Sequence, residues 1–148
     1  MSTEAPPMKT SLDLMRWVGW AQMRAFQEWI SARGITPEQG FVLGYLNDHP
    51  GAIQRDIAKV SRTTPASVTS LLQGLERREL ISREQDPENA RSKRVYITPA
   101  GAELISGFDE ATAQMSEDIL SALTAAERDQ LHSLMLKLTA PLPTPTRD

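Results

Sequence analysis

Three Thr-Pro dipeptides constrain the fold most strongly, because each combines two residue types that favour the start of a helix. A threonine hydroxyl can cap the first turn, and proline fits the first helical position, where its missing N–H costs nothing. The dipeptides are Thr36-Pro37, Thr64-Pro65 and Thr98-Pro99. Thr36 and Thr124 also precede Gln39 and Glu127 by three residues, which is the capping-box spacing. We therefore predict helices that begin near residues 37, 65, 99 and 125.

The spacing of apolar residues supports these helices and predicts others. The spacing i, i+3, i+4, i+7 recurs in the helix after Thr64 and in the last helix, as expected for one buried face. A long helix is predicted over 11–32, ended by Gly34, and a short one over 53–60. A single apolar stripe after Thr98 predicts one continuous helix. Its members are Leu104, Phe108, Ala111, Met115 and Ile119.

Polar and apolar residues alternate in two stretches, 81–85 and 94–98, and turn-forming residues lie between them. This pattern predicts a β-hairpin with a long charged loop over 86–93. A short helix, a turn, a capped helix and a hairpin make a winged helix-turn-helix in a mainly α chain. We predict one integrated domain with an N-terminal arm and dimerisation helix (1–34), a DNA-binding lobe (35–98), C-terminal dimerisation helices (99–139) and a disordered tail (140–148).

Composition argues against several other functions. The 148 residues include no cysteine and two histidines, and no metal-ligand spacing or glycine-rich phosphate loop occurs. We therefore expect neither an enzyme nor a cofactor or metal site. No apolar run approaches the roughly 20 residues that span a bilayer. The N-terminus shows no secretory signal, so we predict a cytoplasmic protein without a membrane partner.

The middle of the chain carries the features expected of a DNA-binding surface. Residues 51–98 hold nine Lys/Arg and six Asp/Glu, although the whole chain has a net charge of −3. The helix face opposite Val68 and Leu75 carries small or polar residues, which can approach base edges closely. The predicted contacts from the turn and this helix are Thr63, Thr64, Ala66, Ser67, Thr69, Ser70 and Gln73. The alternative is an exposed, Ser/Thr-rich face without a partner.

The hairpin adds basic residues beside that helix. Arg91, Ser92, Lys93 and Arg94 are predicted to contact phosphates or the minor groove, where arginine is favoured electrostatically. Alternatively, Asp86 pairs with Arg91 and stiffens the loop. The alternative function is that of a winged helix that serves only as a protein–protein adaptor.

Residues 35–104 resemble the MarR family of winged-helix regulators. The resemblance rests on I-T-P-E-Q-G-F-V-L-G-Y-L, D-I-A-K-V-S-R-T-T-P-A-S-V-T-S-L-L-Q-G-L-E-R-R-E-L-I and D-P-E-N-A-R-S-K-R-V-Y-I-T-P-A-G. It implies a homodimeric repressor that binds a pseudo-palindromic operator in double-stranded DNA and is often released by a small aromatic ligand. Asn89 stands where the family often has a second aspartate. The sequence over 39–46 looks most like that of family members that control multidrug efflux genes.

The first predicted helix is apolar on every side, which favours burial against a second chain. A well-buried core helix in a monomer is the alternative. Two indoles and a guanidinium share one face of this helix and could line an aromatic pocket. The predicted ligand-binding residues are Trp17, Trp20, Arg24, Phe41, Tyr45 and Phe108. The alternative is that this aromatic stripe belongs to the core.

Overall fold

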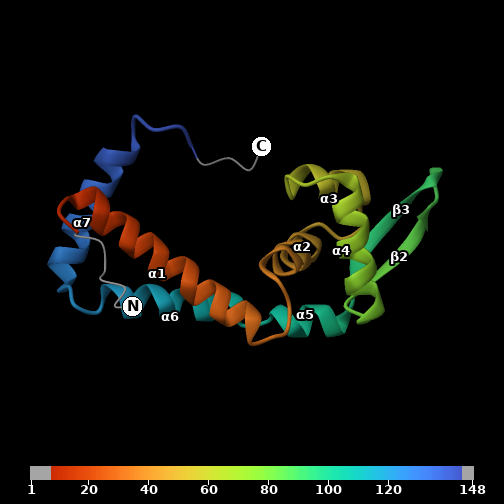
Figure 1. The fold of residues 1–148 in the computed structure, drawn as a ribbon, viewed down its shortest axis with the longest axis horizontal. Coiled ribbons are helices and arrows are strands. Elements are labelled where there is room, and N and C mark those ends of the chain that lie inside the picture. Colours follow the sequence, from red (N-terminus) through yellow and green to blue (C-terminus); the bar gives the residue numbers. More distant parts are fainter. Residues whose placement is uncertain (1–7, 145–148) are drawn as a thin grey trace, which may run out of the picture.

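The computed structural model describes residues 8–144, and its ribbon has two lobes at opposite ends of a long molecule (Figure 1). The helical lobe comprises α1 (Ser11–Ser31), α6 (Phe108–Leu120) and α7 (Ala125–Thr139). The winged lobe comprises α2 (Pro37–Asp48), β1 (Ala52–Ile53), α3 (Gln54–Val60), α4 (Pro65–Arg77), β2 (Ile81–Asp86), β3 (Asn89–Ile97) and α5 (Pro99–Ile105). Residues 1–7 of the predicted arm and 145–148 of the predicted tail lie outside the described residues. The mainly α winged helix-turn-helix is confirmed.

The predicted helix starts are confirmed by their caps. The hydroxyls of Thr36, Thr64 and Thr98 each accept a hydrogen bond from the backbone N–H three residues later. Thr36 and Gln39 form the full capping box. At Thr124 the box is half formed, because the hydroxyl binds the Glu127 N–H without a reciprocal side-chain bond. Water can satisfy the remaining groups at this exposed helix end.

The prediction of one continuous helix after Thr98 is wrong. The helix stops at Ile105, and Gly107 adopts a left-handed conformation (φ 79°) before α6 begins. Glycine has no Cβ to oppose this conformation, so the chain changes direction although its apolar spacing continues. As a result α5 packs against α2 and β3, whereas α6 packs along α1.

The predicted wing loop is only partly correct. Regular pairing of β2 with β3 ends at Gln85 and Lys93, as predicted, but beyond a register shift one further pair, Asp86 and Asn89, closes the wing. The sheet has the order β1-β3-β2, and β2 and β3 are joined by a tight turn at Pro87-Glu88. Two side chains stabilise this turn. The Asp86 carboxylate accepts from the Glu88 N–H at 3.0 Å, and the Asn89 side chain accepts from the Arg91 N–H at 3.0 Å. The short β1, paired with β3 at Ala52 and Val95, was not predicted.

The hydrophobic core lies almost wholly in the winged lobe. It joins α2, α3, α4 and the sheet through fully buried side chains that include Leu43, Ile57 and Leu72, and Ile30 is the one buried residue of α1. By contrast, α6 and α7 bury none of their described residues. Apolar side chains therefore remain exposed on α1 and α7. They include Leu12, Trp17, Trp20, Met23, Leu134, Leu136 and Leu138.

Candidate nucleic-acid interface

A tight turn sets α4 against α3. Arg62 has a left-handed backbone (φ 52°) at the turn position where glycine is usual, and the Thr63 N–H bonds the Ala58 carbonyl at 3.3 Å. Behind the turn, Ile57 of α3 and Val68 of α4 belong to one buried cluster. The opposite face of α4 is thereby turned to solvent, beside the wing (Figure 1).

The predicted contact residues of the turn and α4 differ in exposure and in hydrogen bonding. Ala66, Ser67, Ser70 and Gln73 are exposed, and the side chains of Ser70 and Gln73 make no hydrogen bond to the rest of residues 8–144. The hydroxyl of Thr64 is engaged in the helix cap and also donates to the Ser67 hydroxyl at 2.9 Å. Thr63 and Thr69 are partly buried.

Sequence reasoning missed Gln54, which begins α3 and fixes the Thr69 side chain. Its amide nitrogen donates to the Thr69 hydroxyl at 2.6 Å, and this hydroxyl in turn donates to the Pro65 carbonyl at 2.9 Å. The pair is separated by 15 residues, so no local spacing could reveal it. Because its hydroxyl already donates and accepts within the protein, Thr69 braces α4 against α3.

The wing presents its basic residues in different ways. Arg91 and Lys93 are exposed, and the Arg91 guanidinium makes no hydrogen bond or ion pair with the rest of the described chain. Arg94 and Ser92 are partly buried. Nε of Arg94 donates to the Asp86 carboxylate at 3.3 Å, so the predicted alternative of an Asp86–Arg91 pair is wrong. Strand pairing explains this, because it sets Arg94 opposite Glu84, two residues before Asp86 on β2.

A second ion pair joins α4 to the wing. The Arg83 guanidinium on β2 donates to the Glu76 carboxylate near the end of α4 through Nε, at 3.0 Å, and through Nη2. These hydrogen bonds hold the pKa of Glu76 below its ordinary value, and the positive charges of Arg83 and Lys93 add to the effect. The spacing of α4 and the wing is therefore set by a charge-assisted, two-point contact.

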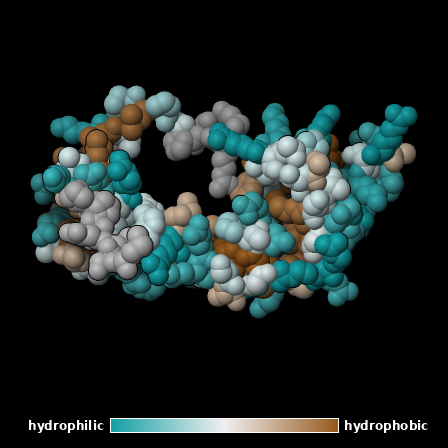
Figure 2. Space-filling view, in the orientation of Figure 1, coloured by the Kyte–Doolittle hydropathy of each residue, from teal (hydrophilic) through white to brown (hydrophobic). Residues whose placement is uncertain are grey.

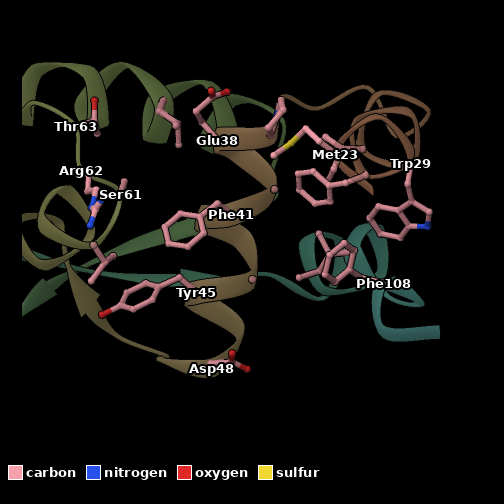
Figure 3. Close-up of a pocket in the computed structure, with 18 of the residues that line it drawn as sticks. Met23, Trp29, Glu38, Phe41, Tyr45, Asp48, Ser61, Arg62, Thr63 and Phe108 are labelled. Carbon is pink, nitrogen blue, oxygen red and sulfur yellow. The ribbon is translucent and has the colours of Figure 1, made fainter. Parts of the chain in front are cut away.

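A cavity of about 770 Å³ lies between the two lobes (Figure 3). The structure brings three of the predicted ligand residues to it, Phe41, Tyr45 and Phe108. The aromatic wall is completed by Phe26 and Trp29, whose rings both meet Phe108 edge-on at 5.6 and 5.2 Å. Sequence reasoning missed this pair because the predicted stripe lies on a different face of the same helix.

The other three predicted ligand residues do not line this cavity. Trp17 and Trp20 are exposed on α1, and Arg24 lies 5.5 Å from the Trp20 ring while its Nε donates to Glu28 at 2.8 Å. The arginine that does line the cavity is Arg62 of the helix-turn-helix turn. Figure 3 shows it on the same side as Phe41 and Tyr45.

Two exposed carboxylates also line the cavity, Glu38 in the first turn of α2 and Asp48 at its last residue. Figure 3 shows them at the two ends of α2, with Phe41 and Tyr45 between them. No group of three or more His, Asp or Glu side chains within residues 8–144 could hold a metal ion. Within the same residues, no helix combines the length and the hydropathy needed to cross a bilayer.

Comparison with known proteins places this architecture in a family. The MarR family model matches residues 35–93. The HTH-type transcriptional repressor NicR of Pseudomonas putida is 27% identical over 143 residues, which cover 92% of this chain and 90% of NicR. MepR, which regulates the multidrug efflux pump MepA of Staphylococcus aureus, is 31% identical with a TM-score of 0.81, over 90% of this chain and 99% of MepR.

MepR has also been solved with bound partners. Its DNA complex is 32% identical to this chain, with a TM-score of 0.74, over 88% of this chain and 98% of that one. Its complex with ethidium bromide is 31% identical to this chain, with a TM-score of 0.66, over 90% of this chain and 97% of that one. The predicted similarity to an efflux-type regulator is confirmed by these matches. With the winged helix-turn-helix, the exposed α4 face and identity above 30% over nearly the whole length, the chain belongs to the MarR family of DNA-binding transcriptional regulators.

Proposed function

We propose that this chain acts as a homodimeric repressor that binds a pseudo-palindromic operator and is released by a small aromatic ligand. The observation that carries DNA recognition is the pairing of an exposed, small and polar α4 face with a basic two-stranded wing. In this proposal α4 enters the major groove, where Ser70 and Gln73 reach base edges. Arg91 and Lys93 contact phosphates or the minor groove. The DNA complex of MepR supports this arrangement.

Uncovered apolar side chains support the homodimer. Most of the large apolar residues of α1 and α7 are exposed in one protomer, and Figure 2 shows apolar atoms gathered on the surface at the α7 end. Contiguous exposed apolar surface of this kind marks an interaction site. We assign dimerisation to the helices of residues 1–34 and 99–139 except α5, which packs on the winged lobe. We assign DNA binding to residues 35–98.

Substitution on α7 tests the dimer. Leu134→Glu places a charge in the apolar face, so we expect a shift from dimer to monomer in light scattering at micromolar concentration. His132→Glu introduces the same side chain about half a turn away on the same helix and should leave the dimer intact. A wild-type chain that is already monomeric under these conditions would contradict the assignment.

The position and lining of the cavity support a ligand-responsive mechanism. Its volume lies within the range of small-molecule sites, and its walls come from both lobes. On one side stand Phe26, Trp29 and Phe108, and on the other stand the helix-turn-helix turn and Ser67 of α4. A ligand there can favour a relative position of the lobes in which the two α4 helices no longer match successive major grooves. DNA affinity then falls only by the factor with which the ligand prefers that position. The ethidium complex of MepR supports an aromatic occupant.

Tryptophan fluorescence tests the ligand site directly. We expect quenching by at least one probe from a panel of salicylate, neutral aromatics and aromatic cations, and we expect Trp29→Phe to remove most of it. Trp17→Phe is the matched control, because Trp17 lies outside the cavity. If Trp17→Phe removes the quenching and Trp29→Phe does not, the site lies on the exposed part of α1.

A further inference from the structure

The chain passes between the helical lobe and the winged lobe at two short connections. Residues 32–36 join α1 to α2, and residues 106–107 join α5 to α6. Both connections contain a glycine with a left-handed backbone, Gly34 (φ 68°) and Gly107 (φ 79°). Rotation of one lobe against the other must be absorbed near these residues, because rigid helices begin on either side.

Arg33 lies in the first connection and binds next to the second. Its Nε donates to the Leu104 carbonyl at 3.1 Å, and its Nη1 donates to the Trp29 carbonyl at 2.9 Å. Leu104 is the penultimate residue of α5, whose last carbonyls have no partner within the helix. The guanidinium carbon also lies 3.3 Å from the centre of the Trp29 ring, which lines the cavity. One side chain therefore links the cavity wall, the end of α1 and the end of α5.

Arg78 reaches the same connection from the other direction. It caps the C-terminus of α4, and its Nη1 donates to the Gly34 carbonyl at 2.7 Å, across 44 residues of sequence. Gly34, which follows Arg33, is thus held by the end of α4, the helix whose exposed face we propose contacts DNA. Residues 33 and 34 are consequently bonded to α4, α5 and the aromatic wall at once.

We propose that Arg33 and Arg78 are positioning residues that fix the orientation of α4 relative to α1 and pass a change at the cavity wall to α4. This proposal rests on the proposed function for its dimer and its ligand. A ligand that moves Trp29 displaces the surface on which Arg33 is stacked. The bonds to Leu104 and Gly34 then carry that displacement to α5 and α4.

The first experiment needs neither ligand nor dimer. In Arg33→Met, hydrogen exchange at amides 104–108 and 33–36 should speed up at least several-fold relative to wild type, while amides in the middle of α2 and α4 keep their protection. Arg33→Lys retains one donor and should recover part of the protection. Arg16→Met removes the same charge from an exposed site on α1 and is the control. Unchanged exchange at 104–108 in Arg33→Met would overturn the proposal.

The second experiment compares a full operator, selected from random duplexes with wild-type protein, with a duplex that holds one half-site. A loose junction costs affinity only where two α4 helices must match two grooves at once. We therefore expect Arg33→Met and Arg78→Met to bind the full operator about tenfold more weakly and the half-site within about twofold of wild type. Arg78→Lys keeps a donor for the Gly34 carbonyl and should stay near wild type. Equal losses on both duplexes would show that the two arginines merely support folding.

The third experiment measures coupling, with salicylate as the probe. In wild type, saturating operator should raise the salicylate midpoint by the factor with which salicylate weakens operator binding. In Arg33→Met this factor should fall toward one. Because the factor is the ratio of two midpoints of the same variant, a change in the midpoint without DNA does not affect it. A factor that stays at its wild-type value would overturn the relay. If salicylate fails to bind the wild type, the ligand part of the proposed function fails for this probe, and the exchange and half-site experiments still decide the role of the junction.

Discussion

The Asp86 carboxylate and the Arg94 guanidinium join the two strands of the wing, and Arg94 also reaches the segment that precedes β1. Nε of Arg94 donates to Asp86 at 3.3 Å, and Nη1 lies 3.5 Å from the Gly51 carbonyl beside β1. The Asp86 side chain is only 9% exposed, and the Arg94 guanidinium is the cation paired with it. Arg94 therefore ties the end of β2 to β3 and to the segment before β1, while Arg91 and Lys93 remain exposed.

This pair gives a prediction with an unusual sign. Asp86→Ala removes a negative charge from the lobe that we propose faces DNA, which by itself would raise DNA affinity. We expect affinity to fall about tenfold, because Arg94 loses its partner and the end of β2 is no longer tied to β3 near the wing turn. Glu88→Ala, at the exposed turn of the same wing, should leave affinity unchanged or raise it. Fluorescence anisotropy with a labelled operator measures both, and tighter binding by Asp86→Ala would contradict the account.

The exposed residues of α4 and the wing should differ in what they contribute. Gln73→Ala should cost about 1–3 kcal/mol on the operator and much less on random DNA, because we propose that Gln73 reads a base edge. Arg91→Ala should weaken binding to all sequences and reduce the salt slope by about one. Titrations on operator and random duplexes at several salt concentrations separate the two effects. Equal losses on both duplexes for Gln73→Ala would exclude base reading by this side chain.

The Glu76–Arg83 contact predicts a specific pH dependence of stability. The pKa of Glu76 is lowered in the fold, mainly by the hydrogen bond from Arg83, so its contribution is fully present above the unfolded pKa of about 4.3. That contribution is lost as the pH falls through the lowered pKa. Glu76→Gln should therefore be less stable than wild type in urea unfolding at pH 6, and this difference should shrink below about pH 4. Glu84→Gln, on the exposed side of β2, should show no such trend.

Glu79 offers a stabilising substitution. It has a left-handed backbone (φ 57°) between α4 and β2, where a side chain with a Cβ costs roughly 1 kcal/mol. Its side chain is exposed, and its carbonyl accepts from the Thr98 hydroxyl, a bond that any residue can keep. Glu79→Gly should raise the free energy of unfolding by about 1 kcal/mol. Glu79→Ala retains the Cβ and should give no gain in the same thermal or urea measurement.

Local chemistry explains what the sequence predicted correctly. The helix starts depend on residues within one turn, as Thr36 and Thr98 show, and the α4 face follows from helical spacing alone. The incorrect predictions concern features of the fold that contacts between distant residues determine. Gly107 breaks an apolar stripe that continues through it, and the pairing of Ala52 with Val95 joins segments 43 residues apart.

The same distinction applies to the candidate site. The exposure of Ser70 and Gln73 could be predicted from one helix, but the bond from Gln54 to Thr69 depends on how two helices pack. For the cavity, the sequence identified aromatic residues of three helices. It could not show which face of α1 meets α6, so Trp29 was overlooked in favour of Trp17.

Salt-dependent binding to duplex DNA tests the central claim most directly. Operator fragments selected by the pure protein would be titrated from low to moderate salt, and the logarithm of the association constant plotted against the logarithm of salt concentration. A dimer with two α4 helices and two basic wings should bind with a steep negative slope, corresponding to several phosphate contacts, and should prefer operator to random DNA. Failure to select any sequence, with no salt-dependent binding to duplex DNA, would contradict the account.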